Sequence, residues 1–76
     1  MNNKRRKQIS KVIEQIEESK DIITGILDEE QESLDNMPEN LLDSERAEQS
    51  QNAIDLLDEA IGNLEEAVNN LEGAQE

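Results

Sequence analysis

The sequence lacks cysteine, histidine and every aromatic residue, and its 76 residues include one proline and three glycines. The absence of cysteine excludes a disulfide framework. Without cysteine or histidine, the chain has no sulfur or nitrogen ligands for zinc, haem or an iron–sulfur cluster. The acids also lack the Asp-x-Asp-x-Asp-Gly spacing of a calcium-binding loop. We therefore expect no metal ion and no cofactor, and a core built from aliphatic residues and methionine.

Positive charge is scarce as well, because seven basic residues face twenty acids and the net charge is −13. Five of the seven occupy the first eleven positions, and Arg46 is the only cation after Lys20. The basic run Lys4–Lys7 has no aromatic neighbours for base stacking, and the acidic remainder repels phosphate. These features argue against direct nucleic-acid binding.

Long apolar runs are absent, and no stretch approaches the roughly 20 apolar residues of a membrane-spanning helix. The basic start is not followed by the apolar segment of a signal peptide, and Asn2 replaces the glycine that myristoylation requires. We expect a cytoplasmic protein with no membrane partner. Exposed carboxylates without histidine, cysteine or an apolar pocket also predict no catalytic residues and no enzymatic activity.

The most regular feature is a heptad repeat over residues 53–74. The a positions hold Ile54, Ile61 and Val68, and the d positions hold Leu57, Leu64 and Leu71. Alanine takes every g position. This pattern indicates a helix that packs against partner helices, and the alanines favour close packing or simply reflect helix propensity.

A second apolar series steps by threes and fours through residues 5–35. Lys20 and Glu30 occupy two places where the series calls for an apolar side chain. We call the line along which the apolar stripes of the two helices meet the seam. Polar residues in the seam fix the register or the oligomeric state of a coiled coil at a cost in stability. Alternatively, Lys20 extends its ammonium group past the seam to Glu65 or Asp58. Both interpretations stay open.

Turn-forming residues lie between the two helical patterns, in residues 36–44. Asn36 and Pro38 favour a turn, Ser44 is a suitable helix N-cap, and Arg46 is positioned to hold the turn and the start of the second helix. We expect one all-α domain, an antiparallel two-helix hairpin with helix 1 at about 5–35, a turn at 36–44 and helix 2 at about 45–72. Pro38 to Leu42 can form one helical turn within the connection, and Gly73 is the predicted stop of helix 2.

Folding the chain at residues 40–41 sets Leu34 near Ala47 and Ile13 near Val68. The same register brings the basic N-terminus beside acids at the end of helix 2, and we expect electrostatic pairing there. The acids concerned are Glu66, Glu72 and Glu76.

Apolar residues are left over outside the seam. Ile22, Ile26 and Leu56 share one height of the predicted hairpin, and Leu41 and Leu42 cap its tip. A lone two-helix hairpin buries too little apolar surface. We therefore expect a homodimer that completes a four-helix bundle through these residues; binding of a different protein is the alternative use of the same surface.

The segment Asp35 to Glu39, followed by Ser44 to Arg46 and then Ala53-Ile54, resembles a family of small phage and prophage proteins from Gram-positive bacteria. In that family, a Lys/Arg-rich start precedes an Ile/Leu/Glu-rich helix, and an Asn-Met-Pro-Glu turn leads into a second helix. Relatives often carry an aromatic residue where this chain has Leu34. The resemblance implies a phage setting in the host cytoplasm and supplies no activity.

The sequence thus predicts a non-enzymatic interaction module that self-associates and binds or modulates a host or phage protein, such as a defence or DNA-processing factor. One alternative is an acidic DNA mimic that inhibits a DNA-binding protein, with rigidly held carboxylates in place of phosphates. Another is a small structural or assembly accessory whose self-association is its function. A further hypothesis makes the tip, residues 37–46, the partner-docking end.

Overall fold

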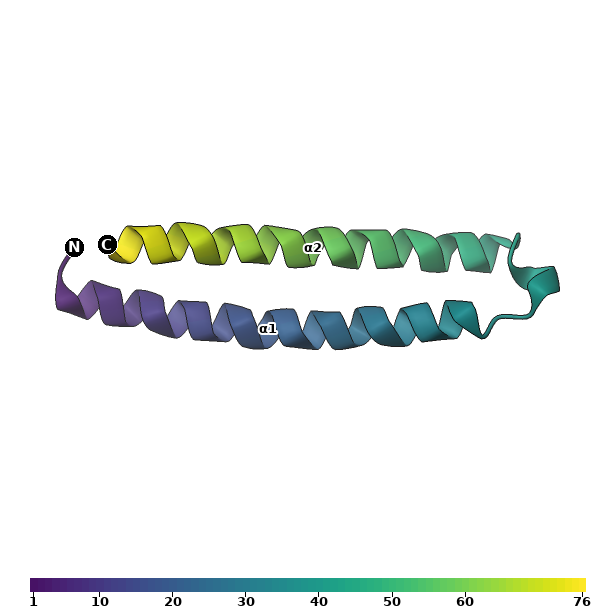
Figure 1. Ribbon diagram of the computed structural model, residues 1–76, viewed down its shortest axis with the longest axis horizontal. Helices are drawn as coiled ribbons and strands as arrows, with labels where there is room; N and C mark the ends of the chain where they lie inside the picture. The colour runs from purple at the N-terminus through teal and green to yellow at the C-terminus, as the bar shows by residue number, and fades with distance from the viewer.

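The computed structural model describes residues 1–76 and consists of two long helices that run antiparallel and are joined at one end (Figure 1). Helix α1 spans Asn3–Asp35, a 3₁₀ turn η1 spans Glu39–Leu41, and α2 spans Glu45–Gln75. The molecule is a rod of 59 × 15 × 12 Å. The predicted all-α hairpin is confirmed.

The first helix begins earlier than predicted because a local side chain caps it. The Asn2 side chain accepts a hydrogen bond from the Arg5 backbone N–H at 2.9 Å, which satisfies one of the free amides of the first turn. The helix ends at Asp35, where the N–H of Asn36 still bonds the Glu32 carbonyl at 3.0 Å. Pro38, two residues further on, disfavours continuation.

The connection contains the helical turn that the sequence predicts. Pro38 precedes η1, and its carbonyl accepts from the Leu41 N–H at 2.8 Å. Ser44 then caps α2, because its hydroxyl accepts from the Ala47 N–H at 3.2 Å. The predicted stop at Gly73 is wrong. No glycine has a positive φ, so Gly73 stays helical and α2 continues to Gln75.

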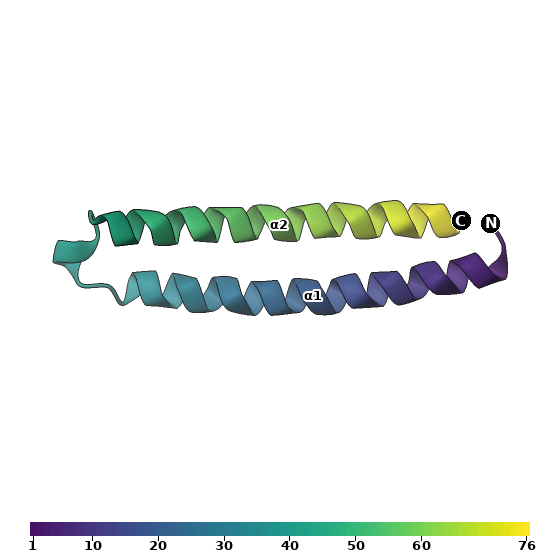
Figure 2. The ribbon, with the colours of Figure 1, turned by 180° about the vertical axis from the view of Figure 1, so that it is seen from behind.

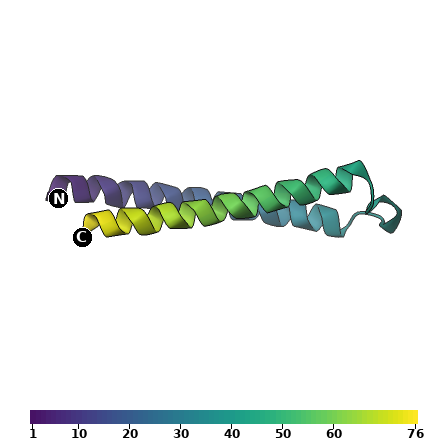
Figure 3. The same cartoon turned by 90° about the horizontal axis from the view of Figure 1, so that it is seen from above.

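The helices meet along the predicted seam, and their register is fixed at the open end. The Arg6 Nε donates to the Gln75 carbonyl at 2.8 Å, and the Gln75 side chain donates back to the Arg6 carbonyl at 3.0 Å. This contact has the same register as the predicted pairs Leu34–Ala47 and Ile13–Val68, because the two residues of each pair lie equally far from the centre of the turn. The helices cross at a shallow angle when seen from above (Figure 3).

The core inside this seam is thin. Four residues are buried, all of them in α2: Ala47, Ser50, Ile54 and Val68. The remaining seam residues of both helices are half-buried. A two-helix layer has no second layer against which to bury the outer half of each helix.

Candidate functional site

The hairpin has two opposite faces. Figure 1 views one of them, and Figure 2 views the other. In α1, the same lettering places Ile13, Lys20, Leu27 and Leu34 at a and Ile16, Ile23 and Glu30 at d. Residues at the heptad positions e and b of both helices flank the seam on one side, and those at g and c flank it on the other. Residues lining the cavities near the tip confirm this arrangement. Gln31, Asp35, Glu48 and Gln51 line one cavity, whereas Ser33, Arg46 and Gln49 line another.

We call the e and b side the acidic face, because ten carboxylates lie on it. They are Glu14, Glu17, Asp21, Asp28 and Asp35 of α1, and Glu48, Asp55, Asp58, Glu65 and Glu72 of α2. Lys20, a seam residue, reaches toward this face, with its ammonium 3.2 Å from Glu17 and 4.0 Å from Glu65. The predicted approach to Glu65 is confirmed, and Asp58 is not contacted. These are the only ion pairs in the molecule.

The second seam polar residue, Glu30, also has a partner across the helix interface. The hydroxyl of buried Ser50 donates to a Glu30 carboxylate oxygen at 2.6 Å. Both residues occupy d positions of their helices, so they form one polar layer within an otherwise aliphatic seam. The sequence pattern identifies Glu30 as exceptional, but only the register identifies Ser50 as its partner.

We call the g and c side the alanine face, after Ala53, Ala60, Ala67 and Ala74 at the g positions of α2. The predicted surplus apolar residues lie here, from both helices. Ile22 is 65% exposed, Leu56 66% and Ile26 48%. Val12, nearer the N-terminus of α1, is exposed as well. The register places Leu56 at a height between Ile22 and Ile26, as predicted.

The alanine face is almost free of negative charge. Glu29 is its single carboxylate, and Arg5 and Arg46 lie near its two ends. The charge of the chain is therefore distributed by face as well as along the sequence. This asymmetry follows from the register that the hairpin imposes on two heptad patterns.

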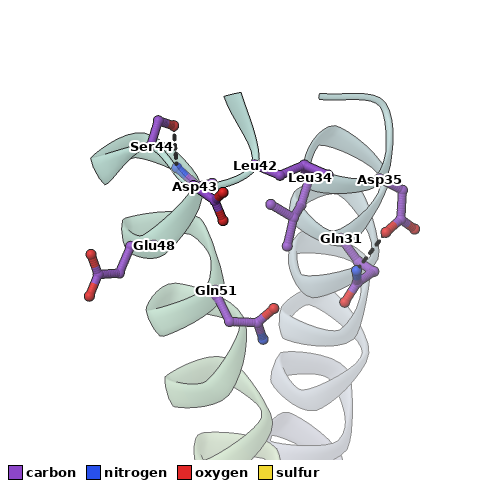
Figure 4. A pocket seen from close by; sticks show the side chains of 9 residues that line it. Gln31, Leu34, Asp35, Leu42, Asp43, Ser44, Glu48 and Gln51 are labelled. Carbon is purple, nitrogen blue, oxygen red and sulfur yellow. Dashed lines mark hydrogen bonds between the residues drawn. The ribbon is translucent and has the colours of Figure 1, made fainter. Parts of the chain in front are cut away.

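The two tip leucines, predicted to cap the hairpin together, lie on opposite sides of it. Leu42 lines an open cavity of about 730 Å³ on the acidic side, into which Leu34 and Gln51 project (Figure 4). Leu41 lines a cavity of about 410 Å³ on the other side, with Met37, Pro38 and Arg46. Both leucines are exposed.

The larger cavity is lined by three carboxylates, and no basic side chain reaches it. The lining residues are Gln31, Leu34, Asp35, Leu42, Asp43, Ser44, Ala47, Glu48 and Gln51. Two hydrogen bonds join its lining residues, from the Gln31 side chain to Asp35 at 2.9 Å and from the Ala47 N–H to the Ser44 hydroxyl at 3.2 Å (Figure 4). The tip therefore offers apolar contacts beside negative charge.

The structure corrects two predictions about cations. The Arg46 side chain makes no hydrogen bond or ion pair, so it does not hold the turn through a polar contact. It lines the two smaller cavities of the tip, one of them together with Glu30. The turn is held by backbone bonds at Asn36 and Pro38 and by the Ser44 hydroxyl.

The basic N-terminus likewise forms no ion pair with Glu66, Glu72 or Glu76. The guanidinium of Arg6 instead bonds the Gln75 carbonyl at 2.8 Å. This carbonyl belongs to the negative end of the α2 dipole, where free C=O groups attract a cation. The compensation that the sequence predicts comes from the helix end rather than from carboxylates.

No group of three or more acidic side chains is arranged to hold a metal ion. Neither helix has a segment apolar and long enough to cross a membrane. No protein-family model, curated protein or solved structure matches this chain. The candidate functional site is therefore defined by the geometry alone: two faces of opposite character and an apolar tip.

Proposed function

We propose that this chain is a non-enzymatic protein–protein interaction module that self-associates and binds or modulates a second protein. One observation carries this proposal. Four of 76 residues are buried, while seven large apolar side chains are exposed on a rod that is two helices thick. A chain of this size rarely has a sufficient core of its own. Contacts with other chains supply the missing burial.

Self-association of two hairpins completes a four-helix bundle, in which each helix buries its apolar stripe against other helices. The second protein is a host or phage protein in the host cytoplasm. The phage setting is supported by the resemblance of the turn, Asn36 to Glu39 with Ser44 to Arg46. The tip, with exposed Leu41 and Leu42, is the end of the rod that offers apolar contacts to such a protein.

Affinity capture from a host lysate, with and without nuclease, tests the proposal. Wild-type bait is compared with a Leu41→Ser/Leu42→Ser variant, because the backbone bonds of the turn do not use these side chains. We expect a defined protein to be captured in the presence of nuclease and at high salt, and to be lost with the variant. A wild-type bait that retains no protein above background contradicts the binding of a second protein.

A DNA mimic is the second candidate, and the ten carboxylates of the acidic face favour it. At 1.5 Å of rise per residue, these carboxylates extend over about 40 Å, roughly one per 4 Å. Duplex DNA carries about one charge per 1.7 Å. The single face therefore falls well short of the charge density of DNA. A mimic predicts capture of a basic DNA-binding protein that duplex DNA displaces and that salt weakens steeply.

A structural or assembly accessory is the third candidate, supported by the same exposed apolar side chains. In that case, self-association is itself the function. The expected result is a stable oligomer of wild-type chain together with no captured protein under any salt condition.

A further inference from the structure

We propose that the alanine face is the surface through which two copies of this chain associate, with both acidic faces turned outward. The proposal rests on the self-association proposed above and adds which face is used.

Charge selects between the two faces. A two-fold symmetric interface brings each surface patch against its own copy. Pairing two acidic faces sets ten carboxylates of one copy against ten of the other. Repulsion between these like charges, and the loss of their hydration, both oppose association. The alanine face brings a single carboxylate, Glu29, from each copy. Only this face is compatible with a copy of itself.

The side chains of the alanine face suit helix packing. Its g positions carry mostly small or aliphatic residues on both helices, with Val12, Ser19, Ile26 and Ser33 on α1 and alanine on α2. Small side chains let the backbones of two helices approach closely. Three larger apolar side chains project from this surface of small residues and are half to two-thirds exposed: Ile22, Ile26 and Leu56. Because they share one height, a two-fold axis at that height gathers six apolar side chains.

The surface area supports an interface of standard size. A folded monomer of 8.6 kDa typically exposes about 4,700 Å², whereas this chain exposes 5792 Å², an excess of roughly 1,100 Å². One face of a rod 59 Å long and 15 Å wide has an area of about 900 Å². Stable interfaces bury about 800 Å² per partner. Covering one face therefore brings the exposed area close to that of an ordinary globular chain.

The test measures the oligomeric mass of three proteins by sedimentation equilibrium. The first is the wild type, and the second is Ile26→Lys/Leu56→Lys on the alanine face. The third is Asp28→Asn/Asp55→Asn, which makes the same change in net charge at the same height of the acidic face. We expect the wild type and the acidic-face variant at twice 8.6 kDa, and the alanine-face variant as a monomer or an unfolded chain.

Three outcomes contradict parts of the proposal in different ways. A wild-type monomer at every concentration overturns self-association altogether. A dimer that survives Ile26→Lys/Leu56→Lys overturns the choice of face and leaves self-association standing. A dimer lost only in the Asp28→Asn/Asp55→Asn variant assigns the interface to the acidic face.

A milder variant keeps the test decisive if the double lysine variant does not fold. Leu56→Ser removes a side chain that is two-thirds exposed in the hairpin, so an isolated hairpin loses little. We expect its dimer dissociation constant to rise about tenfold or more, with helix content recovered at high chain concentration. An unchanged dissociation constant overturns the assignment of the face.

Discussion

Each polar side chain of the seam has a partner that its position makes available. Glu30 accepts from Ser50, Lys20 approaches Glu17 and Glu65, and Arg6 bonds the carbonyl of Gln75. No buried side-chain nitrogen or oxygen lacks a hydrogen bond. A polar group in a partly buried seam is tolerated when it is paired and costly when it is not.

Replacing Ser50 by alanine tests this pairing. We expect Ser50→Ala to lower the free energy of unfolding by about 1–2 kcal/mol, because the Glu30 carboxylate loses its donor. Urea titration at fixed chain concentration measures the change. Asn52→Ala, at an exposed position on the outer side of α2, is the control and should change stability little.

Removing both polar groups should have the opposite effect. The variant Glu30→Leu/Ser50→Ala makes the layer apolar, and we expect it to unfold at a higher urea concentration than the wild type. A double variant less stable than the wild type contradicts the view that the polar layer costs stability.

Both long helices run without interruption through their glycines. Gly25 and Gly62 lie in helix interiors with ordinary helical backbone, and a Cβ at either position meets no atom within 4 Å. Neither glycine therefore serves a tight turn or a close contact, and each lowers helix stability relative to alanine.

We expect Gly25→Ala and Gly62→Ala each to raise the free energy of unfolding by about 0.5–1 kcal/mol. Thermal unfolding followed by circular dichroism at fixed concentration measures the gain. Gly73→Ala, in the last turn of α2, should gain less because helix ends fray. A loss of stability at Gly25 or Gly62 means that the glycine is needed for a contact outside the hairpin.

The start of α2 depends on one hydroxyl. Ser44→Ala removes the acceptor for the Ala47 N–H, and we expect a loss of about 1 kcal/mol in unfolding free energy. Ser44→Asp, which keeps an acceptor at the N-cap, should restore most of the loss. If the alanine variant is as stable as the wild type, solvent satisfies that amide equally well.

The heptads and the turn made the fold predictable from the sequence. Ile54, Leu57 and their repeats identify the seam, and Pro38 with Ser44 places the reversal, so the register of Leu34 with Ala47 follows from chain connectivity. The helix ends were not predictable to the residue, because Asn2 and Gly73 are each compatible with two local conformations. The Arg6–Gln75 contact was missed, since carbonyl oxygens at a helix end are invisible in a charge pattern.

The difference between the two faces can be recognised only when both helices are considered together. Ile22 and Leu56 are recognisable in the sequence as lying outside the seam, but only the antiparallel register shows that the g and c positions of both helices share one side. The separation of Leu41 from Leu42 depends on the backbone path of a short turn, which no periodic pattern describes. Acids surround Arg46 in the sequence, which suggests a turn residue, although its side chain forms an ion pair with none of them.

The net negative charge of the whole molecule opposes its folding, because like charges repel one another. Twenty acids face seven basic residues, and Lys20 alone forms ion pairs. Added salt screens the repulsion among carboxylates more than it weakens so few attractions.

We expect the melting temperature to rise by several degrees between about 10 mM and about 500 mM NaCl at fixed chain concentration. The Asp28→Asn/Asp55→Asn variant should show a smaller rise, because it carries two fewer carboxylates on the acidic face. A melting temperature that falls with salt indicates that ion pairs dominate instead.

The single turn at the tip has a consequence for the order in which the chain folds. Glu30 and Ser50, near the tip, are separated by 20 positions, whereas Arg6 and Gln75, at the open end, are separated by 69. Closing the shorter loop costs less chain entropy. We therefore expect contacts to form first beside the turn and then to extend stepwise toward the termini. In stopped-flow kinetics, Ala47→Gly should mainly slow folding and Val68→Ala should mainly speed unfolding.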